Sequence, residues 1–155
     1  YTTERSLKKL HSGDVDFALF AIQNSIGGIV QESVEAMARY KFKIVEEFSI
    51  PITHHLMKKK DTKKSDIKNI MAHPQVLKQC KGNLEEKYPQ LEKKTGKGDL
   101  IDTAKIAKSL AKGLLDSSTA VLGPKQLAGI YGLEIIDTNL QDDSTNNTSF
   151  LLVSR

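Results

Sequence analysis

The chain has 155 residues, a mass of 17.2 kDa, a formal charge of +4 at neutral pH and a pI near 9.1. Its 39% hydrophobic and 27% charged residues suit a globular protein, and no apolar run reaches the roughly 18 residues of a membrane span. A single cysteine excludes an internal disulfide, no C-x-x-C or H-E-x-x-H spacing indicates zinc, and residues 1–5 do not lead into the apolar segment of a signal peptide. We therefore expect a cytoplasmic protein with no metal site and no membrane partner.

Much of the positive charge lies in a lysine-rich segment, residues 58–64. Such a run is typical of a solvated turn, although a patch that follows nucleic-acid phosphates has the same composition. Aromatic residues make up 6% of the chain and none interleave with the run, which argues against stacking on bases. We predict a solvated turn between strands and no nucleic-acid partner. The modest positive balance also suits a small dianionic substrate.

The first third of the chain has the pattern helix, strand, helix, strand. Residues 3–12 predict a short helix, and the near-continuous apolar run over residues 15–22 predicts a strand buried on both faces. Helical spacing after Gly27–Gly28 predicts a helix with an apolar stripe of Val30, Val34, Met37 and Tyr40. Residues 42–52 predict a further extended segment.

Two helices are predicted in the middle of the chain, after a short strand at residues 67–72. Pro74 suits the first turn of a helix, since proline lacks the N–H that has no partner there. The expected buried face of this helix comprises Val76, Leu77, Cys80 and Leu84. Asp99 or Asp102 can cap the second helix, Gly113 ends it, and its apolar stripe comprises Leu100, Ala104, Ala107, Leu110 and Ala111.

The last third of the chain predicts a strand over residues 118–122, a helix from Pro124 to Gly132, a strand over 133–136, a polar loop over 139–147 and a final strand over 148–153. Strands thus alternate with helices, which indicates an α/β layered sheet. Ligands of such sheets bind beyond the carboxyl ends of strands, at helix N-termini. That rule directs attention to Asn24–Ser25, His73–Pro74, Asp102–Thr103 and Gly123–Pro124.

Several polar residues at these points permit both a structural and a chemical interpretation. Asn24 and Ser25 follow a strand, where their side chains and nearby N–H groups can cap a helix, bind a carboxylate, or do both. Thr103 can likewise cap a helix or bind a carboxylate. His73 either fixes the turn before its helix or contacts a substrate. Cys80 shares a helical face with apolar residues, so a small buried hydrophobe is favoured over a nucleophile.

Segments placed in order along the chain resemble motifs of the catalytic domain of prephenate dehydratase. Residues 21–28 (AIQNSIGG) are similar to P-I-E-N-S-x-x-G, residues 52–56 (ITHHL) to I-x-H-x-L, and residues 73–80 (HPQVLKQC) to H-P-Q-A-L-x-Q-C. Residues 102–104 (DTA) stand where the family has S-T-A, residues 131–133 and 141–143 follow as the family order predicts, and residues 146–150 (NNTSF) resemble N-x-T-R-F. The resemblance covers nearly the whole chain.

The resemblance implies a two-lobed α/β fold like that of type II periplasmic binding proteins, with the active site in a cleft between the lobes. By this analogy residues 1–155 form one catalytic domain, with one lobe of about 1–50 and 130–155 and another of about 51–129. The family's first strand and Gly-rich turn are expected before residue 1. Its regulatory ACT domain would follow residue 155, so we do not expect feedback control through such a domain from this sequence.

The implied reaction converts prephenate to phenylpyruvate in phenylalanine biosynthesis, with no metal or organic cofactor, in an enzyme that forms a homodimer. Because aromatisation of the ring drives the reaction, the protein has to hold a dianion and assist the departing hydroxyl group. The resemblance assigns this assistance to Thr148, and the implied substrate-binding residues are Asn24, Ser25, His73, Thr103, Asn146, Ser149 and Phe150. Without the resemblance, Thr148 has the pattern of an ordinary β-branched strand residue.

Three residues depart from the family motifs. Ser149 replaces an arginine, Gln23 replaces a glutamate, and Ala72 replaces a serine. Loss of the arginine weakens binding if it contacts a substrate carboxylate, and has a smaller effect if it only braces the loop. A strand also directs Ser149 to the face opposite Thr148 and Phe150. Two alternatives therefore stay open: a prephenate decarboxylase-like enzyme that does not aromatise the ring, and a non-catalytic module that binds aromatic ligands.

Overall fold

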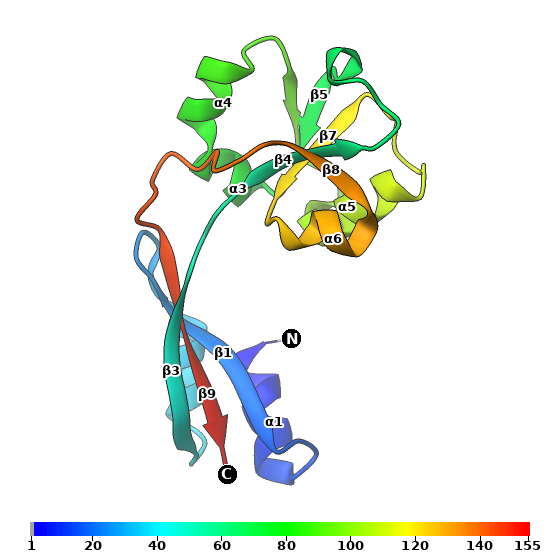
Figure 1. Ribbon diagram of the computed structural model, residues 1–155. Helices are drawn as coiled ribbons and strands as arrows, with labels where there is room; N and C mark the ends of the chain where they lie inside the picture. The colour runs from blue at the N-terminus through cyan, green and yellow to red at the C-terminus, as the bar shows by residue number, and fades with distance from the viewer. Residues whose placement is uncertain (1) are drawn as a thin grey trace. The chain divides into compact units, whose positions relative to one another are not determined.

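The computed structural model describes residues 2–155 and divides into two compact units, each drawn in Figure 1. Unit 1 comprises residues 2–52 and 145–155, and unit 2 comprises residues 53–144. Each unit contains one sheet with helices. The expectation of an α/β chain divided into two parts is therefore confirmed.

Unit 1 is built on a four-stranded antiparallel sheet in the order β2-β1-β9-β3. Its elements are α1 (Thr3–Ser12), β1 (Phe17–Asn24), β2 (Gly28–Ile29), α2 (Gln31–Met37), β3 (Lys43–Pro51) and β9 (Asn147–Ser154). The C-terminal strand β9 pairs with both β1 and β3 (Figure 1). The end of the sequence therefore holds together two strands from its beginning.

Helix α1 has the bounds that its sequence predicts. Thr2 accepts a hydrogen bond from the N–H of Arg5 at its start, and Gly13 ends it in the left-handed conformation with φ of 84°. Leu7 and Leu10 point into the core of unit 1. The other members of this core are Ala18, Phe20, Ala36, Leu151 and Val153.

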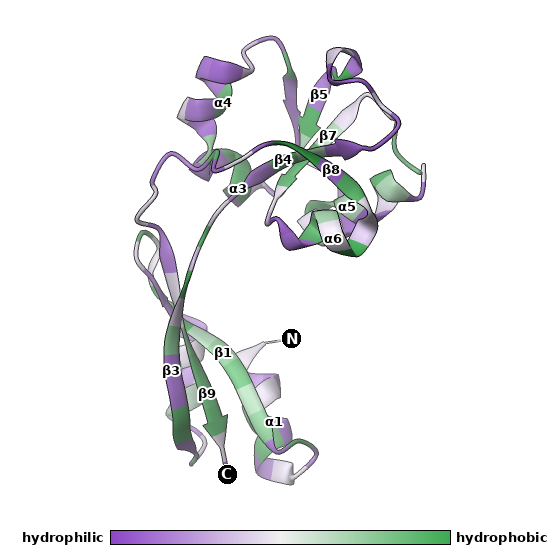
Figure 2. Cartoon of the chain, in the orientation of Figure 1, coloured by the Kyte–Doolittle hydropathy of each residue, from purple (hydrophilic) through white to green (hydrophobic). Residues whose placement is uncertain are grey.

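Strand β1 is buried on one face only, so the prediction of a strand buried on both faces is wrong. Ala18 and Phe20 pack with α1 and α2, whereas Phe17 and Leu19 are 56% and 51% exposed. Successive side chains of a strand point to opposite faces, and among residues 2–155 the helices of unit 1 cover the face that carries Ala18 and Phe20. Figure 2 shows β1 and β9 coloured as apolar along much of their length.

The predicted stripe of α2 is also wrong in part. Val34 is 44% exposed, while Ser33 and Ala36 are buried. The Ser33 hydroxyl donates a hydrogen bond to the Ala21 carbonyl at 2.6 Å, so this polar side chain is satisfied when buried. A pattern of hydrophobic residues alone does not predict a buried serine.

Unit 2 contains a five-stranded mixed sheet in the order β6-β5-β7-β4-β8. Strands β6, β5 and β7 are parallel, and β4 is antiparallel to both β7 and β8. In chain order the elements are β4 (His55–Lys59), η1 (Lys64–Asp66), β5 (Asn69–Met71), α3 (Pro74–Gln79), α4 (Lys81–Lys87), β6 (Glu92–Lys94), η2 (Gly98–Ile101), α5 (Thr103–Ala111), β7 (Thr119–Gly123), α6 (Gln126–Tyr131) and β8 (Leu133–Asp137).

Helices cover both faces of this sheet. Leu56 and Leu122 pack against α3 and α4 in one cluster, and Met57 and Val121 pack against α5 and α6 in another. The two clusters alternate along β4 and β7 because neighbouring strand residues point to opposite faces. Helix α3 begins just after β5 ends, and Thr103 at the start of α5 contacts both His73 and Gly123 at the ends of β5 and β7.

Three predictions for unit 2 are corrected by the structure. The helix that begins at Pro74 is two helices, since the backbone leaves the helical conformation at Cys80 (φ −118°, ψ 10°). Lys58 is not in a solvated turn: it lies in β4, is 5% exposed and forms an ion pair with Glu134. Residues 130–144 do not join residues 1–50, because β8 pairs with β4 inside unit 2.

No helix in the described part of the chain combines the length and the hydropathy that a membrane crossing requires.

Candidate active site

Asn24, at the end of β1, is the centre of a polar cluster in unit 1. Its Nδ2 donates to Thr148 Oγ1 at 3.0 Å, to Asn146 Oδ1 at 2.7 Å and to the carbonyl of Asn147 at 3.2 Å. Its Oδ1 accepts the N–H groups of Ile26 and Gly27 at 3.0 and 2.8 Å. The side chain therefore fixes the turn after β1 and also binds the beginning of β9.

Strand register explains why residues so distant in sequence meet. Asn24 on β1 lies opposite Thr148 on β9, and Ile50 on β3 lies opposite Thr148 on the other side. A bulge between Ala21 and Gln23 shifts the register just before this point. The extra residue of the bulge brings Asn24, rather than Gln23, beside Thr148.

Ser25 ties the turn after β1 to the segment before β9. Its Oγ accepts the N–H of Asn147 at 2.9 Å and donates to the carbonyl of Thr145 at 3.2 Å, and its N–H donates to the carbonyl of Asn147 at 2.9 Å. Asn146 is 1% exposed, and among the described residues its buried Nδ2 has no hydrogen-bond partner. An unpaired buried donor is costly, so Asn146 is suited to donating to a bound oxygen.

The hydrogen bond from Asn24 decides what the Thr148 hydroxyl can do. Asn24 Nδ2 is a donor only, so Thr148 Oγ1 accepts this bond with a lone pair and keeps its own hydrogen. That hydrogen is available to a further acceptor. Asn24, Asn146 and Thr148 carry no charge, so this donor does not depend on a titration.

Ser149 takes part in a different arrangement from Thr148. Its Oγ lies 2.8 Å from Ser49 Oγ on β3, and on β1 it lies opposite Gln23. As the neighbour of Thr148 in a strand, Ser149 points to the opposite face. This position favours a role for Ser149 in bracing β9 against β3, on the face away from the Thr148 hydroxyl.

Phe150 shares the face of Thr148 because it is two residues further along β9. It stacks on Phe48 of β3, with ring centroids 5.9 Å apart and planes 19° apart. Phe150 also lines a cavity of about 350 Å³ in unit 1, together with Leu19, Ala21 and Val30 among others. The ring position is therefore set by a second aromatic residue, Phe48, that no local motif indicates.

His73 and Thr103 meet in unit 2, where α3 and α5 begin. The N–H of His73 donates to Thr103 Oγ1 at 3.3 Å, and His73 Nδ1 accepts the N–H of Gln75 at 3.1 Å. Asp102 caps α5 by accepting the N–H groups of Ala104 and Lys105 at 2.7 and 3.2 Å. The capping roles of His73 and Asp102 are thus observed, and the first N–H groups of α3 and α5 already have partners within the chain.

The two adjacent histidines of β4 are buried. His54 Nε2 bonds to Gln79 Oε1 at 2.8 Å, and burial lowers the pKa of His54, which this hydrogen bond only partly opposes. Burial, the positive charge of Lys125 and His54 lower the pKa of His55, whose Nε2 lies 3.2 Å from Thr53 Oγ1. Both imidazoles are therefore suited to a neutral state.

Cys80 is fully buried among apolar residues, as its spacing predicts. Burial, with a smaller contribution from the negative charge of Asp142, raises the pKa of the Cys80 thiol to about 12. A nucleophilic role needs the thiolate, so this environment excludes one.

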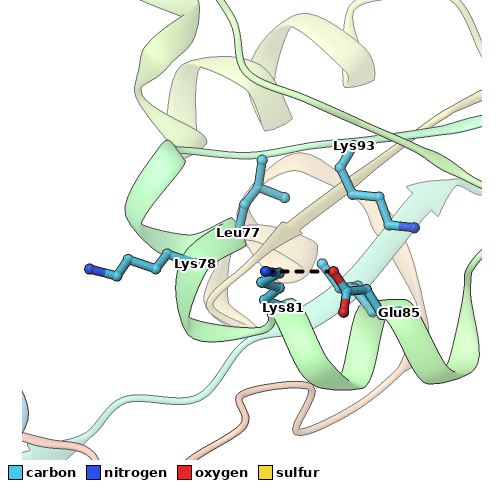
Figure 3. A pocket seen from close by; sticks show the side chains of 6 residues that line it. Leu77, Lys78, Lys81, Glu85 and Lys93 are labelled. Carbon is cyan, nitrogen blue, oxygen red and sulfur yellow. Dashed lines mark ion pairs between the residues drawn. The ribbon is translucent and has the colours of Figure 1, made fainter.

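A largely apolar cavity of about 420 Å³ lies beside α3 and α4 (Figure 3). Leu77 and Leu84 line it together with Lys78, Lys81, Glu85 and Lys93. In Figure 3 the Lys81 ammonium faces the Glu85 carboxylate, at 3.9 Å. The cavity shares no residue with the His73–Thr103 cluster.

Within residues 2–155 no three His, Cys, Asp or Glu side chains are grouped so as to hold a metal ion.

The model of the family described as prephenate dehydratase matches residues 1–155. The chain belongs to the prephenate dehydratase family. Arogenate dehydratase/prephenate dehydratase 1, chloroplastic, of Arabidopsis thaliana is 34% identical over 142 residues, which are 91% of this chain and 34% of that protein. Prephenate dehydratase of Lactococcus lactis is 34% identical over 144 residues, which are 92% of this chain and 49% of that protein.

A solved member of the family has the same fold. The structure of prephenate dehydratase from Arthrobacter aurescens, in complex with L-Phe, matches with a TM-score of 0.81 and 28% identity. The match covers 99% of this chain and 49% of that one. The chain thus spans between a third and a half of these relatives.

Two contributors to the unit 1 site, Phe48 and Ser49, are not indicated by the family motifs quoted above. Both lie on β3 and reach Phe150 and Ser149 only through the pairing of β3 with β9. The only local signal for them is an extended segment with alternating residue types. Their partners are about 100 residues away along the chain, and sequence spacing does not specify this register.

Proposed function

We propose that the protein is a dehydratase that converts prephenate to phenylpyruvate in phenylalanine biosynthesis. The observation that carries the proposal is the 3.0 Å hydrogen bond from Asn24 Nδ2 to Thr148 Oγ1, which leaves the Thr148 hydrogen for a substrate oxygen. Thr148 is the proposed catalytic residue. Asn24 is a positioning residue, because its amide groups are bonded to the protein itself.

The reaction needs a hydrogen bond more than a strong acid. The bond between the ring and one carboxylate breaks, and its electron pair enters the ring as carbon dioxide leaves. The bond between the ring and its hydroxyl breaks at the opposite ring position, and the departing hydroxide takes up one proton from the solvent and leaves as water. Thr148 donates its hydrogen bond to that oxygen as negative charge develops there, which stabilises the transition state more than the bound substrate.

The remaining residues are proposed to bind the substrate. Asn146 offers its unpaired Nδ2 to an oxygen, Phe150 contacts the ring, and Ser25 holds the turn that carries Asn24. In unit 2, His73 and Thr103 are proposed to receive a carboxylate at the N-termini of α3 and α5. The net charge of +4 favours the approach of a dianion. A homodimer and a cytoplasmic location stay predictions.

The test is product analysis with the full-length protein. Wild-type protein with prephenate is expected to release phenylpyruvate, Thr148→Ser to keep part of the rate because serine retains a hydroxyl, and Thr148→Ala to lose most of it. Thr148→Val is the matched control, because it keeps the branched shape without the hydroxyl. A folded wild-type protein that leaves prephenate unchanged would refute the proposal.

The same assay distinguishes the amino acid arogenate from prephenate as substrate. Two of the relatives named above differ in this respect, since one is named for both substrates and one for prephenate alone. A turnover number measured on each compound assigns the preference, and phenylalanine rather than phenylpyruvate is then the product from arogenate.

A second candidate is decarboxylation without aromatisation, which the neutral Ser149 motivates. Its product would be a non-aromatic keto acid that keeps the ring hydroxyl. The Thr148 hydroxyl, free to donate toward that hydroxyl, favours the dehydratase. A third candidate, a non-catalytic module, predicts calorimetric binding of an aromatic amino acid without any turnover.

A further inference from the structure

Gly123, the last residue of β7, lies in close contact with Thr103 at the start of α5. A Cβ built on Gly123 would lie 2.5 Å from Thr103 Cγ2, a distance that carbon atoms in folded proteins do not reach. The same Cβ would lie 3.2 Å from Leu127 Cδ1, the movable end of a side chain. The Thr103 methyl therefore occupies the space that a side chain at residue 123 would need.

Space, and not backbone conformation, explains the glycine at this position. The φ angle of Gly123 is not positive, so its backbone conformation is one that any L-amino acid can adopt. It is buried and pairs with His55 on β4, which fixes its place in the sheet. Gly123 is held in the sheet by β4, and Thr103 belongs to the first turn of α5, so their contact limits how closely α5 can approach the end of β7.

The position of Thr103 in turn affects α3. Thr103 Oγ1 accepts the N–H of His73 at 3.3 Å, and His73 caps α3 through Gln75. A shift of Thr103 away from β7 would lengthen a bond that is already long, and would separate the first turns of the two helices. Gly123, Thr103 and His73 thus form a chain of contacts across the ends of β7 and β5.

We propose that Gly123 is a positioning residue for substrate binding, because its missing side chain lets Thr103 hold the starts of α5 and α3 together. The inference rests on the proposed function only where it predicts how substitutions at Gly123 change the kinetic constants. The arrangement of Gly123, Thr103 and His73 is a property of the fold, and it can be tested without substrate.

The test pairs two substitutions that compensate in volume. Gly123→Ala introduces the clashing Cβ, and Thr103→Ser removes the methyl group that it meets while keeping the hydroxyl that accepts from His73. In the full-length protein, Gly123→Ala is expected to raise KM and to lower kcat/KM by up to about a hundredfold, as for a displaced binding group. The double variant Gly123→Ala/Thr103→Ser is expected to return close to Thr103→Ser alone.

Gly129→Ala in α6 is the matched control, since a Cβ at that position meets nothing within 4 Å. It is expected to leave both kinetic constants unchanged. Gly123→Ala with wild-type KM and kcat would overturn the proposal, as would a loss that Thr103→Ser does not rescue.

Hydrogen exchange of the His73 amide gives a readout that does not need activity. Gly123→Ala is expected to speed this exchange, and the double variant is expected to restore it. If Gly123→Ala does not fold, the folded double variant still tests the contact, because failure of both to fold would overturn the compensation. An inactive wild-type protein with the expected exchange pattern would refute the proposed function and leave the positional inference supported.

Discussion

Asn24 Nδ2 donates to Thr148 Oγ1 at 3.0 Å across 124 residues of sequence. The amide gives a hydrogen that the hydroxyl accepts, so the direction of the bond is fixed and the Thr148 hydrogen points elsewhere. An uncharged pair thus supplies a free hydroxyl hydrogen, and the donor proposed to assist the leaving group does not depend on a residue that titrates. The Asn24 carbonyl simultaneously holds the turn at Ile26 and Gly27.

Asn24→Asp separates these two roles of Asn24. The carboxylate can still accept from Ile26 and Gly27, but it has no hydrogen to give and instead accepts from Thr148. We expect kcat to fall by about a hundredfold while the folded state is kept. The double variant with Thr148→Ala should be no slower than Thr148→Ala alone, since both changes remove one interaction. Additive losses in steady-state kinetics would show that Asn24 acts independently of Thr148.

Ser149→Arg and Gln23→Glu test the bracing role of Ser149. These positions lie opposite each other on β9 and β1, so opposite charges placed there should attract. The free energy of unfolding of each variant is measured by denaturant titration. We expect the change in the double variant to be more favourable, by about 0.2–1 kcal/mol, than the sum of the changes in the two single variants. KM should not change in any of the three proteins. A lower KM in Ser149→Arg alone would instead indicate that residue 149 contacts the substrate.

His54 predicts a loss of stability in mild acid. Burial lowers the pKa of folded His54 below its ordinary value of 6.5, so the unfolded chain takes up a proton first as the pH falls. The free energy of unfolding should therefore decrease as the pH falls through about 6.5, and level off below the folded pKa. His54→Gln should reduce this slope, and His55→Gln should reduce it further because the pKa of His55 is lowered too. The exposed His11, replaced by Gln, is the control; an equal slope in all variants would contradict the assignment.

Cys80 should resist thiol reagents in the native protein. Its pKa of about 12 and its full burial leave almost no accessible thiolate at neutral pH. We expect labelling only through unfolding, at a rate that rises with denaturant in step with the unfolded fraction. The chain has one cysteine, so the mass of the labelled protein reports this site alone. Native labelling at the rate of the denatured protein would disprove the assigned environment.

Local sequence determined the elements whose signals are close together in the chain. Helix α1 begins at a capping threonine and ends at a left-handed glycine, and Gly132 ends α6 in the same way. Asp102 caps α5, and the order of helices and strands indicates the α/β class. Capping and turn geometry act within a few residues, so the sequence alone predicts where these helices begin and end.

Tertiary structure decided which strands pair and what they cover. The face of β1 that is buried, the membership of residues 130–144 in unit 2 and the burial of Lys58 all depend on partners distant in sequence. The β1 bulge then selects Asn24 as the neighbour of Thr148, and the volume of the Thr103 methyl explains Gly123. A one-residue change of register would reverse every strand face, and only the packing of the folded chain excludes that change.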